Sequence, residues 1–512
     1  MISRDGANIS LWQDNIDPFR SSTIASPDTI YDLIVVGGGI TGLSTALLLQ
    51  QAGLNCLLLE AANLGFGTTG GTTAHLNTLL DTPYSKISKN FNDAKARQVA
   101  QIARDAIELI RCNINEQKID CAFEDADGFL FAKDEKQEKE LDEILDASLK
   151  AGIDIEYTQR IPVPFTFRKA ARIKGQAKFS PLPYVQGLAR AFEKAGGVIV
   201  QDCRVVDTKH GEIIEASAST GDIYKGRKLF YATHIPPGVN LLHLRCVPYR
   251  SYAMAITLAV DSYPEGLSYD MEDPYHYYRT QRVNGRNYLI AGGEDHKTGH
   301  GDNLENYFLE LESHVRKHFN AGTVKYQWSS QYFEPADGLP YIGHLPGMAD
   351  NIYVATGFGG NGMIYGTASA LIMKDILVDE DKTYDDPFSP NRVKPIAGFK
   401  NFISHNADVV KEFAGKCFGH DEIQELSDLA AGEARVILFE NKKLAVYKSE
   451  DGVIYALNPI CTHLKCEVNW NDAEKTWDCP CHGARYRYDG VVLTGPASEG
   501  LERIEIKELI EK

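Results

Sequence analysis

The densest group of reactive side chains lies near the end of this 512-residue chain. Two short boxes, CTHLKC at 461–466 and CPCHG at 479–483, bring four cysteines and two histidines close together. Such spacing is typical of a metal site. Zinc is one candidate, but zinc sites usually place about two to four residues between paired ligands and need no additional cysteines. Two thiolates on one iron and two imidazoles on the other would instead hold a [2Fe–2S] centre, at a higher potential than four thiolates give.

A second candidate site is a glycine-rich turn near the start of the chain. The segment from Tyr31 reads strand, turn, helix, strand, and Gly37, Gly39 and Gly42 form the pattern G-x-G-x-x-G in its turn. Glycines at these places permit a tight turn, close approach of a pyrophosphate, and packing of the helix on the strand. The helix N-terminus offers N–H donors to phosphates, and Glu60, which ends the second strand, can accept hydrogen bonds from an adenosine ribose. We therefore predict a dinucleotide site.

A second G-x-G-x-x-G, at Gly357, Gly359 and Gly362, also follows a strand and begins a helix. No further strand or acidic residue completes a nucleotide-binding unit after it. We interpret it as a helix N-terminus directed at some other electron-rich atom. One nucleotide site without a second unit fits a tightly held flavin better than a flavoprotein reduced by NAD(P)H.

Periodicity predicts the elements that position these residues. Helical patterns occur at 93–119, 134–151 and 183–196, and strand-forming runs dominate from about 198 to 335. The segment 434–506 reads as short strands with Asp-Gly turns. Before it, the charged, proline-rich EDKTYDDPFSPNRVKP is predicted to be a linker, followed by a short helix at 407–416.

Charge and hydropathy exclude several classes of protein. Lys and Arg number 53 against 70 Asp and Glu, so the net charge is −17. A field of this sign repels a phosphate backbone, and nucleic acid is not an expected partner. No stretch of about 20 apolar residues predicts a membrane span, and the first residues lack the apolar run of a secretory signal. We therefore expect a cytoplasmic protein.

Residues 30–380 resemble the FAD-dependent oxidoreductases of the D-amino-acid oxidase superfamily, which includes glycine and sarcosine oxidases. The resemblance rests on DLIVVGGGITGLSTALLL, GQAKFSPLPYVQGLARAFEKAGGVIVQDCRVV, and DGLPYIG followed by NIYVATGFGGNGM. It implies an α/β FAD-binding domain of Rossmann type, built from segments at about 30–80, 170–235 and 335–380. It also implies an interleaved α+β substrate domain with a mostly antiparallel sheet, at about 81–169 and 236–334. Residues 1–29 are then an N-terminal arm.

The same resemblance implies further contacts to FAD. Val205 matches the position whose backbone contacts the adenine, and the turn that opens at Gly359 faces the pyrimidine end of the flavin. The stretch GTTGGTTAH at 67–75 takes the place of the loop beside the pyrophosphate and the flavin. His75 in this stretch is expected to form hydrogen bonds, although some relatives carry a covalent histidyl–flavin link. Beyond the first glycine turn, the implied FAD contacts are Thr72, His75, Val205, Gly359, Gly362 and Met363.

Two positions depart from the glycine-oxidase pattern. The Arg of a W-x-x-x-R segment, which binds the substrate carboxylate in that group, is Tyr332 here, and a second pocket Arg of some members is Gly360. Tyrosine cannot make the bidentate contact of a guanidinium with a carboxylate. This difference argues against an ordinary free amino acid as the substrate. Arg279 is a candidate replacement, or it holds a surface carboxylate.

An aromatic substrate pocket is expected from four tyrosines, Tyr275, Tyr277, Tyr278 and Tyr332. Desolvation among them would favour a neutral amine, whereas the alternative is that they only pack the sheet. Arg279, Tyr277 and Tyr332 are the pocket candidates, and no residue is assigned as catalytic.

Residues 434–506 resemble the Rieske domains of respiratory and photosynthetic cytochrome complexes. A small all-β Rieske domain is therefore expected at 433–512, after a linker at 381–432. The resemblance implies that Cys461 and Cys479 bind one iron of a [2Fe–2S] cluster. His463 and His482 would bind the other iron.

The surroundings of the cluster follow from the same resemblance. Cys466 and Cys481 occupy the positions of the disulfide that ties the two cluster loops together. Tyr486 matches a hydroxyl that donates to a cluster sulfur, but Ala484 replaces a second donor, a serine. Losing a donor to an electron-rich sulfur destabilises the reduced state, which predicts a lower potential than in respiratory Rieske centres.

The two sites together predict a relay from substrate to FAD, to the [2Fe–2S] cluster, and to an external acceptor such as a ferredoxin, cytochrome or quinone. By the resemblance, the flavin step is dehydrogenation of a C–N bond in an amine or N-substituted amino-acid-like substrate. Two alternatives stay open. Either NAD(P)H or another carrier feeds the flavin in an electron-transfer reductase, or the protein is redox-responsive and not catalytic.

Overall fold

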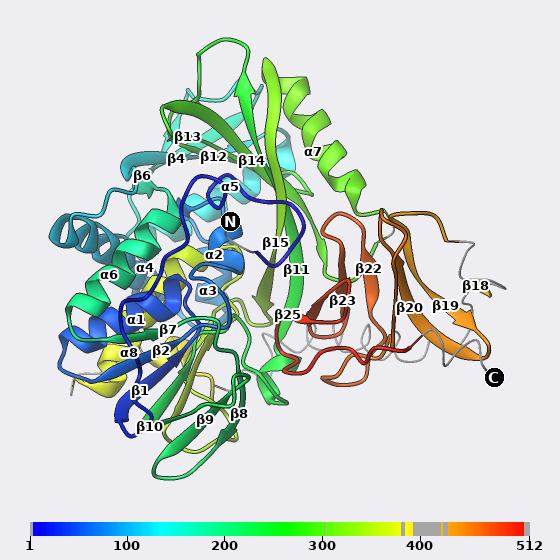
Figure 1. Cartoon of the computed structure of the whole chain (residues 1–512). Coiled ribbons are helices and arrows are strands. Elements are labelled where there is room, and N and C mark those ends of the chain that lie inside the picture. Colours follow the sequence, from blue (N-terminus) through cyan, green and yellow to red (C-terminus); the bar gives the residue numbers. More distant parts are fainter. Residues whose placement is uncertain (1–3, 302, 380–384, 393–420, 423–428, 506–512) are drawn as a thin grey trace.

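The computed structural model describes residues 4–301, 303–379, 385–392, 421–422 and 429–505 (Figure 1). The predicted helix at 407–416 lies outside the described residues. Within the described part, the strands form two large sheets before residue 360 and two small sheets after residue 420.

The first large sheet contains the glycine-rich turn. Its strands are β1 (Ile30–Val36), β2 (Cys56–Leu59), β7 (Val198–Val200), β8 (Val205–Lys209), β9 (Ile214–Ala218), β10 (Ile223–Tyr231), β16 (Tyr341–His344) and β17 (Ile352–Thr356). They lie in the order β16-β17-β10-β1-β2-β7, with the β8–β9 hairpin joined to β10. The pairs from β17 to β7 are parallel. A parallel sheet needs cover on both faces, which explains why β2 and β17 are apolar and buried throughout.

Helices cover one face of this sheet. They are α1 (Ile40–Gln51), α4 (Asp93–Gln117), α6 (Pro181–Lys194) and α8 (Gly362–Leu377). Helix α1 is buried on nearly all sides because it lies between the sheet and α6 and α8. Helix α4 begins where the Asn92 side chain accepts a hydrogen bond from the Lys95 backbone N–H at 2.9 Å. The shorter helices are α2 (Thr68–Gly71), α3 (Tyr84–Asn90), α9 (Asp385–Phe388) and the 3₁₀ turn η1 (Leu241–Leu244).

The second large sheet is antiparallel apart from one pair, as predicted. Its strands are β3 (His75–Leu76), β4 (Glu124–Ala132), β5 (Ile155–Thr158), β6 (Lys169–Lys178), β11 (Cys246–Leu258), β12 (Leu267–Asp270), β13 (His276–Val283), β14 (Arg286–Lys297) and β15 (Ala321–Pro335). The order is β15-β11-β14-β13-β12-β4-β6-β3. Helices α5 (Glu135–Ala151) and α7 (Glu305–His318) pack against it. The return to the first sheet, expected at about 170, comes after β6, because β6 pairs with β4 and β5.

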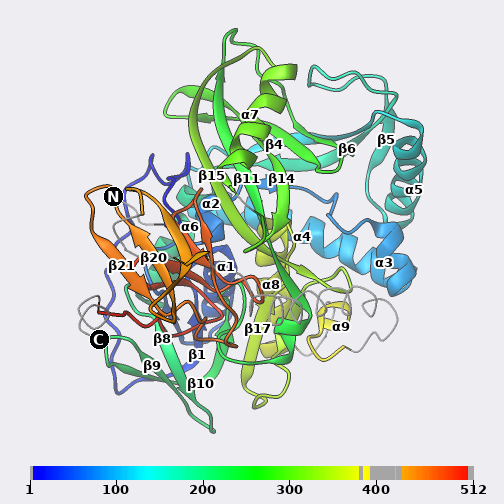
Figure 2. The same ribbon diagram turned by 90° about the vertical axis from the view of Figure 1, so that its right-hand side faces the viewer.

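Two small four-stranded sheets form the C-terminal part, which is all-β as predicted. One contains β18 (Asp421–Glu422), β19 (Ala434–Phe439), β20 (Lys442–Lys448) and β21 (Ile454–Leu457), and the other contains β22 (Asn469–Asn471), β23 (Thr476–Asp478), β24 (Arg485–Arg487) and β25 (Val492–Thr494). The Asp-Gly turns lie where they were predicted, with Gly452 and Gly490 at φ of +83° and +90°. These sheets lie on the side of the molecule where β11 runs, and Figure 2 turns that side toward the viewer.

The N-terminal arm is more buried than its polar sequence suggested. Leu11 and Trp12 pack in a core with Trp328, and the Trp12 indole N–H donates to the Thr72 carbonyl at 2.6 Å. The described part of the predicted linker is also packed, since Phe388 is fully buried. Among the described residues, no helix has the length and apolar content needed to cross a membrane.

Candidate functional sites

The glycine-rich turn joins β1 to α1 in the shape that a dinucleotide needs. A Cβ on Gly42 would lie 1.9 Å from the Gly37 carbonyl oxygen, and one on Gly37 would lie 2.5 Å from that of Ala232. Only glycine therefore permits this contact between strand and helix. Helix α1 begins without a hydrogen bond from a side chain at its N-cap, Gly39. The Ile40 N–H donates to Thr69 Oγ1 at 3.2 Å, and the following N–H groups of the first turn can face an anion.

A long cavity opens from this turn and runs toward the second sheet. We name it the flavin cavity. The predicted residues that line it are Gly37, Gly39, Glu60, Thr72, Val205, Tyr277, Tyr332, Gly359, Gly362 and Met363. The Glu60 carboxylate accepts hydrogen bonds from the backbone N–H of Gly38 at 2.6 Å and of Ala62 at 2.8 Å. Burial raises the pKa of Glu60.

His75 and Arg279 are not among the described residues that line the flavin cavity. His75 Nδ1 lies 3.0 Å from the Tyr269 hydroxyl, and its ring meets Tyr277 edge-on at 5.4 Å. Burial lowers the pKa of His75 well below its usual value, so the imidazole is neutral. It therefore stands behind Tyr277 rather than in the cavity wall.

Arg279 does not supply the substrate pocket with a guanidinium, which corrects that expectation. The side chain is fully buried and donates to the carbonyl oxygens of Ala74 at 2.6 Å and Phe179 at 3.0 Å. A third bond goes to Gln281 Oε1 at 2.7 Å. The prediction of an aromatic pocket is also wrong for Tyr278, because alternate residues of β13 face opposite sides of the sheet. Its hydroxyl contacts His314 at 2.7 Å in the core below α7.

A second pocket adjoins the flavin cavity, and the two share Tyr332, Phe358 and Gly359 as wall residues. We name it the acidic pocket. Its charged wall residues are Asp81, Lys86 and Glu334. Burial raises the pKa of Asp81 to about 6. No sequence pattern marked Asp81 or Glu334, since each is an ordinary acid far from any motif.

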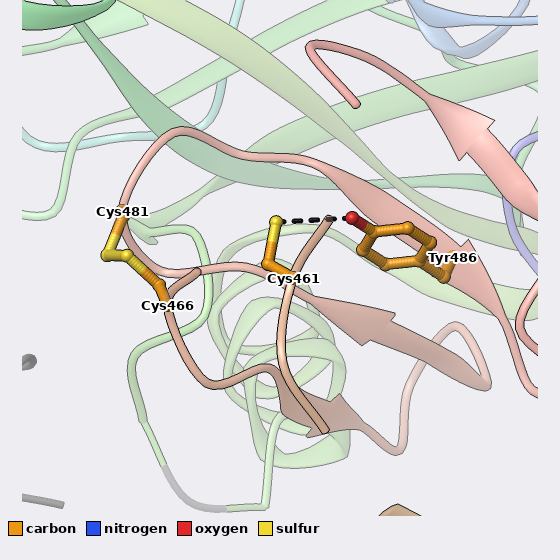
Figure 3. Close-up of a disulfide and its surroundings, with 4 residues drawn as sticks. All are labelled: Cys461, Cys466, Cys481 and Tyr486. Atoms are coloured by element: carbon orange, nitrogen blue, oxygen red, sulfur yellow. Dashed lines mark hydrogen bonds between the residues drawn. A yellow bond between two sulfur atoms is a disulfide. The ribbon is translucent and has the colours of Figure 1, made fainter. Parts of the chain in front are cut away.

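The two cysteine–histidine boxes meet at the tip of the C-terminal part. Cys466 and Cys481 form a disulfide with an S–S distance of 2.00 Å, and Figure 3 shows it beside Cys461. The Tyr486 hydroxyl lies 3.1 Å from the Cys461 sulfur. Hydrogen bonds from Cys479 and Tyr486 lower the pKa of Cys461 to about 6. The two free thiols of the boxes, those of Cys461 and Cys479, are thus buried and adjacent, and the Cys461 thiol has a lowered pKa.

The two histidines of the boxes lie side by side, and each has one ring nitrogen without a partner. The rings of His463 and His482 are 5.1 Å apart. Each Nδ1 atom is buried without a hydrogen-bond partner in the described part of the chain. His463 Nε2 contacts the Gly238 carbonyl at 3.1 Å. Burial lowers the pKa of both rings, so both are neutral as metal ligands require.

Comparison with known proteins identifies both halves. Residues 32–376 match the family described as FAD dependent oxidoreductase. The chain belongs to this family. Residues 421–505 match the Rieske [2Fe-2S] domain. The protein is therefore an oxidoreductase whose cofactors are FAD and a [2Fe–2S] cluster, which confirms the cofactor prediction.

Relatives of this FAD dependent oxidoreductase differ in how much of the chain they cover. The Rieske 2Fe-2S iron-sulfur protein YhfW of Bacillus subtilis (strain 168) is 31% identical over 97% of both chains. The gamma-glutamylputrescine oxidoreductase of Escherichia coli (strain K12) is 23% identical over 69% of this chain and 85% of its own. The crystal structure of glycine oxidase from Geobacillus kaustophilus superposes with a TM-score of 0.57 at 16% identity, covering 71% of this chain and 99% of the oxidase. At that identity the superposition shows the fold alone.

The described residues fit both cofactors. The N-terminus of α1 and the glycines without room for a Cβ form a cradle for the pyrophosphate of FAD. Two buried thiols and two neutral imidazoles with unpartnered Nδ1 atoms match the donor set of a Rieske cluster. The contact of His463 Nε2 with a carbonyl resembles the outer hydrogen bond that orients metal-bound histidines.

Proposed function

We propose that this oxidoreductase dehydrogenates a C–N bond of an amine and passes the electrons from FAD to its own [2Fe–2S] cluster and then to an external acceptor. When bound, FAD supplies the two-electron oxidation of the substrate, and the cluster supplies one-electron transfer. The substrate carbon loses a hydride, the nitrogen loses a proton, and water hydrolyses the resulting imine to a carbonyl compound and an amine. The named activity of the Escherichia coli relative, an oxidoreductase of an amine, supports the substrate side.

The observation that carries the relay is the position of Gln331. This buried side chain of β15 lines the flavin cavity. Its Nε2 donates to the Gly483 carbonyl at 2.9 Å, and Gly483 directly follows His482 in the chain. One side chain therefore connects the flavin cavity to the loop that carries a cluster histidine.

The C-terminal part also closes the flavin cavity directly. Residues 493–495, 497 and 498, in and after β25, belong to the cavity wall. Arg204, another wall residue, donates to the carbonyl oxygens of Val492 at 3.1 Å and Leu493 at 3.2 Å. This shared wall supports a short path between the two cofactors.

Anaerobic mixing of the holoenzyme with a panel of primary and secondary amines tests the proposal. We expect some amines to bleach the flavin absorbance and then to produce the electron paramagnetic resonance signal of a reduced Rieske cluster. Bleaching by NADH but by no amine would overturn the substrate side. Bleaching that never produces the cluster signal would overturn the relay.

A matched pair of variants on β15 tests the role of Gln331. Gln331→Leu removes the amide bond to Gly483 while keeping the volume of the side chain, and Gln327→Leu makes the same change at an exposed position of the strand. We expect Gln331→Leu to slow cluster reduction severalfold more than flavin reduction in stopped-flow traces. Gln327→Leu should change neither rate, and equal traces for both variants would exclude Gln331 from the path.

A further inference from the structure

The acidic pocket contains more negative than positive side chains and adjoins the flavin cavity. Asp81 and Glu334 face it with one cation, Lys86, and none of its described wall residues is an arginine. Asp295 adds a third carboxylate directly behind Tyr332, which bonds to it. A pocket of this composition repels a substrate carboxylate and attracts a substrate cation.

Asp81 stands at the boundary between the acidic pocket and the flavin cavity. One of its oxygens, Oδ2, accepts a hydrogen bond from the Gly360 backbone N–H at 2.6 Å. Its own backbone N–H donates to Asn361 Oδ1 at 2.8 Å. The side chain has accessible surface and belongs to the pocket wall, so this surface opens into the pocket. The carboxylate is thereby held in place beside the turn that lines the flavin cavity.

Tyr332 presents an acceptor to the pocket and not a donor. Its hydroxyl donates to Asp295 Oδ2 at 2.9 Å, so the phenol proton is already used. Burial raises the pKa of Tyr332 well above its usual value, which keeps that proton on the oxygen. The remaining lone pairs can accept an N–H bond from an ammonium group. They offer nothing to a carboxylate, which needs a donor.

We propose that the substrate is a diamine or polyamine whose protonated second nitrogen is held by Asp81, Glu334 and the Tyr332 oxygen while the reacting nitrogen lies in the flavin cavity. The inference rests on the proposed function, since it names the substrate of that site. The two-chamber geometry supports it, because Tyr332, Phe358 and Gly359 belong to both walls. A substrate with two separated nitrogens can occupy both chambers. The reacting nitrogen must be neutral to lose hydride from its carbon, and the distant ammonium can stay charged.

The titration of the carboxylates predicts how binding of the diamine depends on pH. Burial raises the pKa of Asp81 to about 6 and that of Asp295 to about 7, with Glu294 adding to the effect at Asp295. Burial also raises the pKa of Glu334, while Lys86 and Lys297 oppose it. A bound ammonium favours the ionised carboxylates, so binding releases protons and tightens as the pH rises from about 5 to about 7.

The experiment uses the flavin-loaded protein and compares a diamine with the monoamine that lacks its second charge and with an amino acid that carries a carboxylate. 1,4-Diaminobutane, 1-aminobutane and N-methylglycine are titrated anaerobically, and dissociation constants come from the initial shift of the flavin spectrum before any bleaching. We expect 1,4-diaminobutane to bind about 10- to 100-fold more tightly than 1-aminobutane, because a charged hydrogen bond is worth that factor. The advantage should shrink as the pH falls from about 7 to about 5.

Isosteric variants locate the contact. Asp81→Asn and Glu334→Gln should each reduce the advantage of the diamine about tenfold, whereas Glu312→Gln, a surface acid of α7 paired with Arg316, should retain it. Flavin content and circular dichroism confirm that each variant is folded. An equal affinity of diamine and monoamine, or tighter binding of N-methylglycine, overturns the proposal. Carboxylate-dependent diamine binding without bleaching by any amine would uphold this recognition and refute the dehydrogenase function.

Discussion

Two groups of charged side chains in this oxidoreductase behave in opposite ways. The first, which we name the interface network, joins the N-terminal arm and β11 to the Rieske part and contains Arg4, Asp5, Arg250, Glu474, Asp478 and Arg485. Burial alone would raise the pKa of Asp5 and Asp478, but the arginines outweigh it and lower both. In the acidic pocket, burial prevails and the pKa of Asp81 and Asp295 rises.

The geometry of the interface network explains its balance. Arg485 pairs with Asp5 at 2.7 Å and with Asp478 at 3.2 Å, and Arg250 reaches Asp478 at 3.3 Å. Arg4 contacts Glu474 at 3.2 Å. Three arginines therefore neutralise three acids. The difference teaches that paired buried charge holds the two parts of the protein together, whereas carboxylates with too few cations are available to a ligand.

Breaking a pair in the interface network has the largest expected effect. Arg250→Met keeps the length of the side chain but leaves the network with one uncompensated negative charge. We expect it to lower the free energy of unfolding by about 3–5 kcal/mol, the usual result when one partner of a buried pair is removed. Urea denaturation followed by tryptophan fluorescence measures the change.

The matched control is Arg316→Met on α7, which removes a surface pair with Glu312 at 2.7 Å. Exposed pairs contribute about 0–1 kcal/mol, so this variant should stay close to the wild type. If both variants lost the same small amount, the interface network would have no special structural role.

Removing a carboxylate charge beside the acidic pocket should instead raise the free energy of unfolding. Asp295→Asn is expected to stabilise the fold by about 1–3 kcal/mol above pH 7, since each raised pKa unit costs about 1.4 kcal/mol in the ionised state. The pKa of Asp295 is raised to about 7 by burial, above the unfolded value of about 4. The gain should therefore be absent at pH 4 and grow as the pH rises to about 7. Thermal unfolding of both proteins across this range measures it, and a pH-independent difference would contradict the interpretation.

The cluster loops give a third case, in which a donor is missing rather than a charge. The resemblance implied two hydroxyls near the cluster sulfurs. Tyr486 supplies one of them, next to the Cys461 sulfur, and the fully buried Ala484 stands where the other would be. Ala484→Ser should stabilise the reduced cluster by about 1 kcal/mol, which raises the one-electron potential by about 40–60 mV. Protein-film voltammetry reports the shift, and an unchanged potential would show that the new hydroxyl does not reach a sulfur.

The sequence predicted the parts of the sites that are local in the chain. The glycine turn from Gly37 to Gly42 and the two cysteine–histidine boxes carry their geometry within a few residues, so spacing alone identifies them. Arg279, a pocket candidate, lies on the same face of β13 as Tyr277, but the sequence does not say which distant groups its side chain meets there. Its guanidinium instead holds the backbone at Ala74 and Phe179.

The acidic pocket could not be predicted in this way. Asp81, Asp295 and Glu334 come from three elements separated by about 40 to 210 residues, and each is unremarkable in its own segment. Only the pairing of β11 with β14 and β15 brings two of them together. The N-terminal arm was likewise read as extended because its polar residues have no periodicity, although Arg4 and Asp5 find partners at the other end of the chain.

The contacts between the arm and the Rieske part constrain the order in which the chain can assemble. Arg4 and Asp5 precede their partners Glu474 and Arg485 by 470 and 480 residues in the chain. The ion pairs of Arg4 and Asp5 therefore cannot form before residues 474 and 485 are present, whereas Leu11 and Trp12 of the same arm can already pack against Trp328.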